Sequence, residues 1–249
     1  MAVFIQLLGQ VGSGKSFLAK KLALAKRGIV LPFAKDVYRL ASIVKGGDID
    51  KTQREDRELL KTIGTTWGRE SREVAPDIQN RLDKHKPKEW GSPDIWANIF
   101  VSNCRNLPPS RSVFNDDTRF LNELQIAVAV LNFVPVFVAC RDETRLERIQ
   151  KRGEKYDPSD TEHLSEELAN FLRRRVLDQY LIPVVWSDTN FSRPKLSWAH
   201  ARGDFVRMVK KCRSNEQLME QLDWNRDKAC SLISFLRKAL SQPNASVYA

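Results

Sequence analysis

A glycine-rich segment near the start of the sequence, Gly9–Ser16, has the pattern G-x-x-x-x-G-K-S. Glycines at this spacing let the backbone adopt positive φ and approach a ligand closely, so that successive N–H groups converge on phosphate oxygens. The backbone positions expected to bind phosphate are Gly12, Ser13 and Gly14. Lys15 is expected to reach the β- and γ-phosphates, and the Ser16 hydroxyl to ligate Mg²⁺. A glycine-rich hairpin or a helix cap without a ligand is the alternative interpretation.

The residues on either side of this segment must position it. Val3–Leu8 is a short, nearly continuous apolar run, typical of a strand buried on both faces of a parallel sheet. Residues 17–24 carry apolar side chains at helical spacing. Strand, glycine-rich loop and helix is the order that a phosphate-binding loop requires, because the N-terminus of the helix attracts anions.

Asp116, Asp117 and Arg119 form a second candidate group. They lie at the end of an expected strand over 111–116, and open α/β sheets bind ligands at the carboxyl ends of their strands. Both carboxylates are suited to holding Mg²⁺, and the Arg119 guanidinium is suited to forking onto a second phosphate. Asp117 and Glu123 are also candidate substrate contacts. The alternative is a helix N-terminus, where acidic residues are favoured without any ligand.

Strands and helices alternate along the chain. Five strands are expected, over 3–8, 28–33, 111–116, 134–139 and 181–186, with helices between them. This alternation implies right-handed crossovers and an α/β fold with a mostly parallel sheet covered on both faces. From about residue 199 the pattern is helical only, so we expect a domain over 1–198 and a basic helical extension over 199–249. Residues 69–90 have few apolar residues at a regular period and are expected to form a mobile surface excursion.

The composition narrows the class of protein. A net charge of +10 and a pI near 9.6 suit anionic ligands such as nucleotides, and are also compatible with weak association of the basic tail with nucleic acid. The four cysteines are far apart and indicate neither a zinc site nor a disulfide framework, so a cytoplasmic location is expected. The most apolar stretch, 126–140, is interrupted by Asn132 and Pro135 and is too short for a membrane span.

Several segments together resemble the phage-type deoxynucleoside monophosphate kinases. The most specific are the D-x-R-x-x-N-E run at Asp117–Glu123 and the H-x-S-E run at His163–Glu166. The others, in chain order, are Gly9–Ser16, Pro32–Asp36, Leu60–Thr65, Asp94–Trp96 and Ser187–Asn190. The resemblance covers about residues 2–190. It implies a P-loop kinase fold, a three-layer αβα sandwich with a lid over about 141–168.

The resemblance also implies an activity and its ligands. The reaction would be transfer of the γ-phosphoryl group of Mg-ATP to the 5′-phosphate of a deoxynucleoside monophosphate. Arg119 would then bind the acceptor nucleotide, and four further residues would border the acceptor pocket: Lys35, Asp36, Trp67 and Trp96. For Trp96 a core position on a helical stripe is the alternative, and Lys35 and Asp36 also suit a solvated helix start. Both a monomer and a homodimer are compatible with the sequence.

An arginine run after Cys140 has the spacing of one helical face. Arg145, Arg148 and Arg152 are candidates for phosphate contact at the base of the expected lid, with Arg148 and Arg152 assigned to catalysis and Arg145 to ATP binding. A solvated helix face is the alternative. His163 is interpreted as a loop or capping residue, because phosphoryl transfer depends chiefly on positioning and electrostatics.

Two other functions are compatible with the same residues. One is a kinase acting on a different small acceptor, such as a nucleoside or a phosphorylated metabolite. The other is a nucleic-acid-associated ATPase or 5′-end kinase whose basic tail follows a phosphate backbone. A GTPase is disfavoured, because the strand over 181–186 is not followed by an N-K-x-D run.

Overall fold

The computed structural model describes residues 2–50, 53–88, 90–152, 164–179, 181–188 and 199–240. Contacts divide the chain into two units, which we call unit 1 (Met1–Leu31 and Leu107–Ala249) and unit 2 (Pro32–Asn106) and describe separately. This division differs from the expected boundary after residue 198, because residues 199–240 belong with unit 1.

Unit 1 contains a parallel sheet, which confirms the expected α/β class. Its described strands are β1 (Phe4–Leu8), β2 (Ile29–Val30), β3 (Val113–Asn115), β4 (Val134–Ala139), β5 (Val184–Trp186) and β6 (Ala199–Ala201). They lie in the order β2-β3-β1-β4-β5-β6, and every pair is parallel. This arrangement is compatible with a P-loop sandwich. All six residues of β4 are buried, as its apolar, valine-rich sequence predicts for a central strand.

The sheet has six described strands, so the expected count of five is wrong. The sixth, β6, lies in the segment for which we expected helices only. Its sequence, Ala-His-Ala, has no β-branched residue and is too short to show a clear period. It becomes a strand because it pairs with β5, with Val185 opposite His200. A strand that forms because a neighbouring strand pairs with it cannot be predicted from its own three residues.

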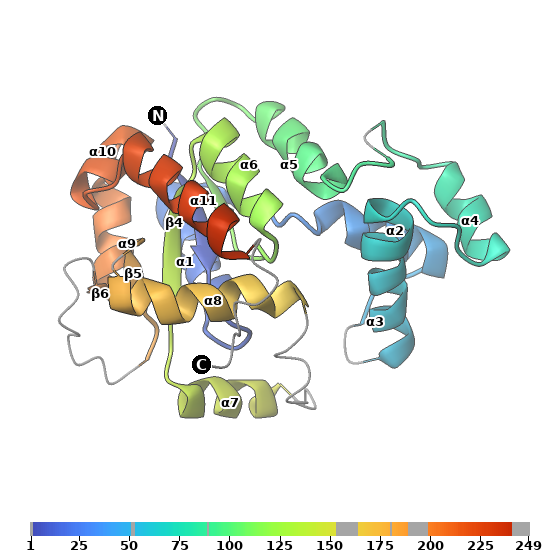
Figure 1. Cartoon of the computed structure of the whole chain (residues 1–249), viewed down its shortest axis with the longest axis horizontal. Helices are drawn as coiled ribbons and strands as arrows, with labels where there is room; N and C mark the ends of the chain where they lie inside the picture. The colour runs from blue at the N-terminus through green and yellow to red at the C-terminus, as the bar shows by residue number, and fades with distance from the viewer. Residues whose placement is uncertain are drawn as a thin grey trace. The chain divides into compact units, whose positions relative to one another are not determined.

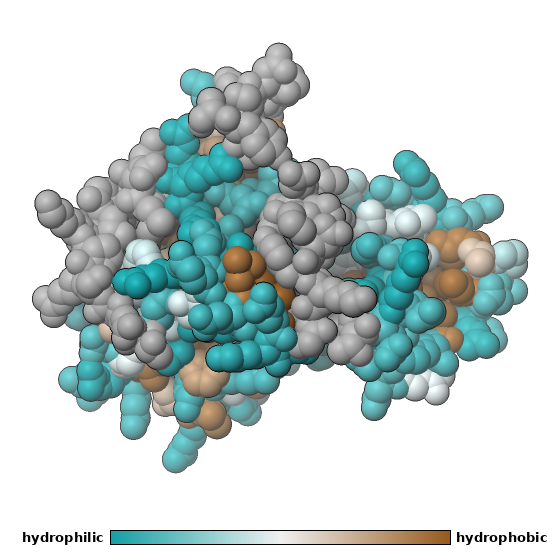
Figure 2. Space-filling view, turned by 90° about the horizontal axis from the view of Figure 1, so that it is seen from below, coloured by the Kyte–Doolittle hydropathy of each residue, from teal (hydrophilic) through white to brown (hydrophobic). Residues whose placement is uncertain are grey.

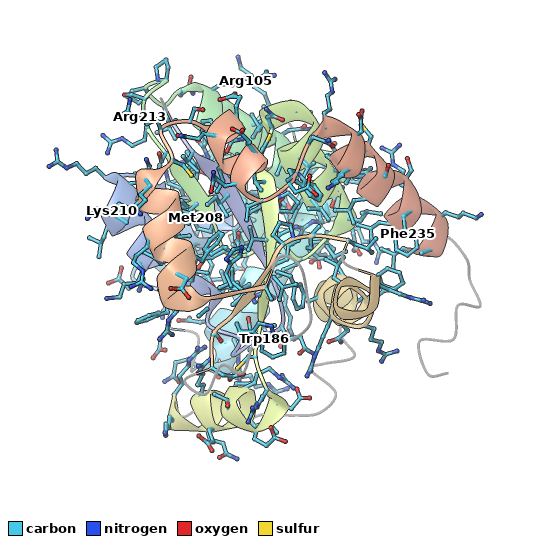
Figure 3. The ribbon with its side chains drawn as sticks, turned by 90° about the vertical axis from the view of Figure 1, so that its left-hand side faces the viewer. Arg105, Trp186, Met208, Lys210, Arg213 and Phe235 are labelled. Atoms are coloured by element: carbon cyan, nitrogen blue, oxygen red, sulfur yellow. The ribbon has the colours of Figure 1, made fainter. Side chains whose placement is uncertain are left out.

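Helices cover both faces of this sheet. They are α1 (Lys15–Lys26), α6 (Leu121–Leu131), α7 (Asp142–Lys151), α8 (Leu164–Gln179), α9 (Arg202–Lys211), α10 (Asn215–Gln221) and α11 (Arg226–Leu240). Helix α1 packs against β1, β3 and α9, whereas α8 packs against β4 and α11 against α6. Figure 3 shows α1 and α9 on one side of the sheet and α8 and α11 on the other.

Residues 199–240 are part of the main core of unit 1. Phe205 of α9 and Leu236 of α11 are fully buried in it. The Asn215 side chain accepts a 3.1 Å hydrogen bond from the backbone N–H of Phe4 at the start of β1. Phe235, labelled in Figure 3, packs against Phe171 of α8 with ring centroids 5.9 Å apart. The segment therefore completes the fold around the central strand.

Unit 2 is helical and has a core of its own (Figure 1). Its helices are α2 (Lys35–Lys45), α3 (Arg54–Lys61), the π-helix η1 (Thr62–Arg69), α4 (Pro76–Asp83) and α5 (Ile95–Arg105). Residues 69–90, for which we expected a mobile surface excursion with few apolar residues at a regular period, contain the helix α4. Val74, Ile78 and Leu82 are four residues apart and pack on the core of unit 2. That spacing was the signal for a helix.

The described part of the surface in Figure 2 is mostly hydrophilic. Four large apolar side chains of the described residues are exposed, namely Phe17, Leu24, Ile43 and Val130. Among the described residues there is no helix with the length and apolar character needed to cross a membrane.

Candidate phosphate-binding site

The candidate residues of unit 1 follow the carboxyl ends of neighbouring parallel strands. Gly9–Ser16 follows β1, Asp116 follows β3, and Ser187 follows β5. β1 lies between β3 and β4, so the chain leaves β1 toward one side of the sheet and later crosses to the other. Ligand crevices in open α/β sheets form at such a reversal of strand order. The topology thus places the glycine-rich loop where a crevice is expected.

Two glycines of the loop have no room for a side chain. Gly9 has φ of 136°, and a Cβ there would lie 2.6 Å from the carbonyl oxygen of Val138. Gly12 has φ of 81°, and a Cβ there would lie 2.8 Å from Cγ of Arg145. Positive φ and close packing both select glycine at these positions. The positions of the glycines in the sequence therefore determine the conformation of the loop.

Lys15 begins α1 and closes the loop. Its ammonium group donates to the carbonyl oxygens of Gly9 and Gln10, the latter at 2.9 Å. Gly14, the residue before α1, has a left-handed conformation, and the first turn of the helix contains no acidic residue. No carboxylate of the first turn therefore neutralises the positive end of α1, which favours an anionic ligand there.

The loop also contains a buried hydroxyl group without a partner in the described part of the chain. Ser13 is 2% exposed, and its Oγ makes no hydrogen bond there. A buried polar group of this kind calls for a ligand or water, because leaving it unpaired costs free energy. Ser16, the second residue of α1, is exposed and available to a ligand. These features fit the binding of a phosphate chain.

Arg148 supports the loop through its backbone carbonyls. Its guanidinium donates to Ser187 Oγ at 2.9 Å and lies 3.3 Å from the carbonyl oxygen of Ser13. Ser187 Oγ in turn donates to the same Ser13 oxygen. These hydrogen bonds hold the backbone of the loop in place from α7 and from the end of β5. The arginine that we assigned to catalysis is thus close to the loop and bound to its backbone.

Arg145 is buried against the same loop. It is only 6% exposed, and its side chain packs on Gly12 while Nε donates to Asp142 at 3.3 Å. An arginine on a solvated helix face is normally exposed, whereas Arg145 is buried and paired with a carboxylate. The structure therefore disfavours the solvated-face interpretation at this position. Arg152 lies at the C-terminal end of α7 and is exposed.

Arg173 of α8 joins the loop to the start of α7. It donates to the Gln10 side chain at 2.8 Å and forms two hydrogen bonds, of 2.7 and 2.9 Å, with the Asp142 carboxylate. Gln10 also donates to Asn170 of α8 at 2.7 Å. The hydrogen bonds from Arg173 hold the pKa of Asp142 below its usual value. Asp142 is thus kept charged beside the loop.

The acidic group after β3 is held by a polar network. Asn115, at the end of β3, donates to the Asp117 carboxylate and to the carbonyl oxygen of Leu31, both at 3.0 Å. Thr118 Oγ1 donates to Asn115 and accepts from the buried Gln6 of β1, both at 2.7 Å. Asp116 and Asp117 are both partly exposed. The network fixes the turn that presents these two carboxylates.

Glu123 caps α6. It is 3% exposed, and its carboxylate accepts from the backbone N–H groups of Arg119 and Phe120 at 2.9 and 3.2 Å. This is the capping role that we gave as the alternative for this segment. Arg119 itself is exposed at the surface of unit 1. Its backbone is therefore fixed by Glu123, whereas its side chain reaches the surface.

Asp188 follows β5 and lies beside the end of β4. Its carboxylate accepts from the backbone N–H of Arg141 at 3.0 Å and from the Cys140 thiol at 3.1 Å. Burial, and next the hydrogen bond to Asp188, raise the pKa of Cys140. Cys140 is therefore a neutral packing residue behind the loop.

The four acceptor candidates of the N-terminal half all lie in unit 2. Lys35 is exposed at the start of α2, and Asp36 accepts from Arg39 and Asn103, both at 3.0 Å. Trp67 and Trp96 are both buried. Their contact with substrate stays a prediction.

The two tryptophans differ in hydrogen bonding. Trp96 Nε1 donates to the carbonyl oxygen of Gly64 at 2.7 Å, within the π-helix η1. Trp67 Nε1 is buried and has no partner in the part of the chain that the structure describes. The unpaired donor makes Trp67 the better ligand candidate of the two. Short π-helical segments are frequent at functional sites.

Some of the expectations fall outside the described residues. They are His163, Thr189, Asn190 and the part of the expected lid over 153–163. In the described part of the chain, no group of three or more histidine, cysteine or acidic residues could hold a metal ion by itself. Mg²⁺ at a phosphate loop needs fewer protein ligands, because phosphates and water complete its shell.

Comparisons with known proteins leave the family undecided. No family model matches this chain, and no curated protein matches it.

Sequence reasoning gave no role to three residues: Gln10, which lies within the loop, and Arg173 and Ser187, which contact the loop. Gln10 occupies a position of the loop pattern that any residue can fill. Arg173 begins a run of three arginines, Arg173–Arg175, in which the sequence does not distinguish one member from the next. Ser187 follows an expected strand, and its place at the carboxyl end of that strand was the available signal.

Proposed function

We propose that this protein transfers the γ-phosphoryl group of Mg-ATP to the 5′-phosphate of a deoxynucleoside monophosphate. The observation that carries the proposal is the glycine-rich loop with Lys15 after the central strand β1, beside β3, which Asp116 and Asp117 follow. That loop supports the proposal of triphosphate binding. The choice of acceptor depends on the resemblance around Arg119.

The residues of unit 1 divide into three roles. The backbone of Gly12–Ser16 and the Lys15 ammonium would bind the phosphate chain, with Lys15 exchanging its carbonyl partners for phosphate oxygens. Ser16 and a carboxylate after β3 would hold Mg²⁺, which neutralises charge on the β- and γ-phosphates. Arg148 and Ser187 would keep the loop in place.

Arg119 would bind the 5′-phosphate of the acceptor and orient it. An acceptor phosphate oxygen would form the new bond to the γ-phosphorus as the bond from that phosphorus to the bridging oxygen breaks, leaving ADP and a deoxynucleoside diphosphate. Such transfer needs cations near the equatorial oxygens and a fixed direction of approach more than it needs an acid or base. Arg145 and Arg152 are candidates to supply further positive charge.

A coupled assay for ADP release, with each of the four deoxynucleoside monophosphates, tests the proposal. We expect at least one of them to stimulate turnover, and Lys15→Ala to reduce it by about 100-fold or more. Arg119→Ala should lower kcat/KM for the acceptor by at least about tenfold and leave ATP affinity within about twofold. Arg226→Ala, an exposed arginine on α11, is the matched control.

Two results would overturn the proposal. One is that no deoxynucleoside monophosphate stimulates ADP release whereas a 5′-hydroxyl oligonucleotide does. The other is that a nucleoside or another phosphorylated metabolite is the only acceptor. Equal loss of ATP and acceptor binding in Arg119→Ala would instead contradict the role given to Arg119.

A further inference from the structure

Two short segments carry most of the net positive charge of this chain. Residues 15–27 and 202–213 together contain ten lysines and arginines and one acidic residue, Asp204. Because the whole chain has a net charge of +10, the remaining residues are almost neutral. Such a concentration is an electrostatic footprint for a polyanion.

The two segments lie side by side in the fold. They form α1 and α9, which pack against each other on one side of the sheet (Figure 3). At one end the Arg202 guanidinium lies 4.8 Å from the centre of the Phe17 ring. At the other end Lys26 Nζ donates to the carbonyl oxygen of Cys212 at 2.5 Å. Charges that are distant in the sequence therefore form one surface.

Helical spacing points these charges outward. On α1 the residues at i, i+3, i+4 and i+7 are Phe17, Lys20, Lys21 and Leu24, and all four are exposed. On α9 the exposed residues Arg207, Lys210 and Lys211 share a face opposite the buried Phe205 and Val209. Figure 3 shows Lys210 projecting away from the sheet. We call the seven exposed residues the α1–α9 face.

Few carboxylates of the described residues on α9 and α10 oppose this charge. Asp204 is exposed and paired with Arg207, which removes one positive charge. Glu216 and Glu220 of the neighbouring α10 are also exposed. The lysines of the face, by contrast, have no acidic residue on α1 and only Asp204 on α9. The face as a whole is strongly positive.

We propose that the α1–α9 face binds single-stranded nucleic acid, with backbone phosphates on its lysines and arginines and a base stacked on Phe17. Phe17 is 49% exposed, and the cationic groups of Arg202 and Lys21 lie 4.8 and 5.5 Å from the centre of its ring. Cations interleaved with an exposed aromatic ring are the features that bind single strands without sequence preference. This inference does not depend on the proposed kinase activity.

The structure favours nucleic acid over an anionic membrane surface. A helix that lies in a membrane buries its apolar side among the lipids. The apolar sides of α1 and α9, with Leu18, Leu22 and Phe205, are already buried in the core of unit 1. Leu24 and Phe17 remain exposed, and two side chains supply little area for insertion.

Fluorescence anisotropy with a labelled 20-nucleotide oligodeoxythymidine and the full chain tests the proposal. If about four phosphates are neutralised, affinity should fall by about 50-fold between 50 and 200 mM NaCl. Lys20→Glu with Lys21→Glu, or Lys210→Glu with Lys211→Glu, should each weaken binding at 50 mM NaCl by about tenfold or more and flatten the salt dependence. Lys20→Gln with Lys21→Gln, and Lys210→Gln with Lys211→Gln, should each weaken binding less than the glutamate pair at the same positions.

Phe17→Ala separates stacking from charge. It should weaken binding by about fivefold or more while the salt dependence stays the same. The matched control is Lys84→Glu with Lys88→Glu, two exposed lysines of unit 2. This pair changes the net charge equally and should leave binding within about twofold. Far-ultraviolet circular dichroism establishes that each variant is folded before it is compared.

Four outcomes would overturn the inference. They are no binding at 50 mM NaCl, an equal loss in the unit 2 control, tighter binding of a duplex of the same length, and binding of phosphatidylserine vesicles without binding of the oligonucleotide. Lys15→Ala keeps the two proposals distinguishable, because it should abolish phosphoryl transfer and retain oligonucleotide binding.

Discussion

Arg173 and Gln10 are joined by a 2.8 Å hydrogen bond between α8 and the glycine-rich loop. The same guanidinium forms a bidentate pair with Asp142 at the start of α7. One side chain therefore connects the loop with both helices, although it lies more than 160 residues from Gln10 in the sequence. The position of Gln10 in the loop is therefore tied to α7 and α8 through this guanidinium.

Arg173→Lys should weaken ATP binding. Lysine cannot reproduce the fork that reaches Gln10 and Asp142 together, so the loop loses part of its support. We expect KM for ATP to rise by about fivefold to tenfold with a smaller change in kcat, measured by ADP release. Arg175→Lys, an exposed arginine on the same helix, is the control. An identical KM in the two variants would contradict the supporting role of Arg173.

Ser187→Ala should destabilise unit 1. The substitution removes the hydroxyl that links Arg148 to the carbonyl oxygen of Ser13, and it leaves that buried oxygen with a weaker partner. The expected loss is about 1–3 kcal/mol in the free energy of unfolding. Urea denaturation measures it, with the exposed Ser102→Ala as control. Equal midpoints for both variants would show that the link adds nothing to stability.

Trp96→Phe should mainly lower stability, whereas Trp67→Phe should mainly raise KM for the acceptor. Both remove similar volume from the core of unit 2, but only Trp96 loses a hydrogen bond, to Gly64. Trp96→Phe should therefore be the less stable by about 1 kcal/mol. Trp67→Phe should raise KM for the acceptor by about fivefold, because its unpaired donor is the one available to a ligand. Denaturation and steady-state kinetics together check both expectations, and a larger acceptor effect in Trp96→Phe would reverse our assignment.

Asp56 should contribute to the acid sensitivity of unit 2. Its buried carboxylate accepts from Lys45 at 2.5 Å and from the backbone N–H of Asp50 at 2.6 Å, and these hydrogen bonds lower its pKa below the ordinary 3.8. A folded-state pKa below the unfolded value stabilises the fold above about pH 4, and the stabilisation is lost as pH falls through the folded pKa.

Asp56→Asn should therefore flatten the loss of stability below about pH 4, because asparagine does not titrate. Urea midpoints at pH 7, 4 and 3 measure the effect. Asp48→Asn, at an exposed position, should keep the acid sensitivity of the original chain. The same pH dependence in both variants would rule out the contribution of Asp56.

Local sequence was enough to predict the loop and most regular elements. The strand expected over 134–139 matches β4 residue for residue. The glycines of Gly9–Ser16 take positive φ at three positions, as their spacing indicates. These features depend on interactions within a few residues, which a sequence pattern records directly.

Tertiary structure decided which distant residues meet this loop. Arg148 and Arg173 are two of many arginines, and only the parallel packing of β1, β4 and β5 brings them, with Ser187, to Gly12, Ser13 and Gln10. Tertiary structure also decided that β6 is a strand, because it forms by pairing with the edge of β5. A pattern of residue types specifies local conformation and buried faces. Which distant residues contact one another depends on the order of the strands in the sheet. The local sequence around each residue does not specify that order.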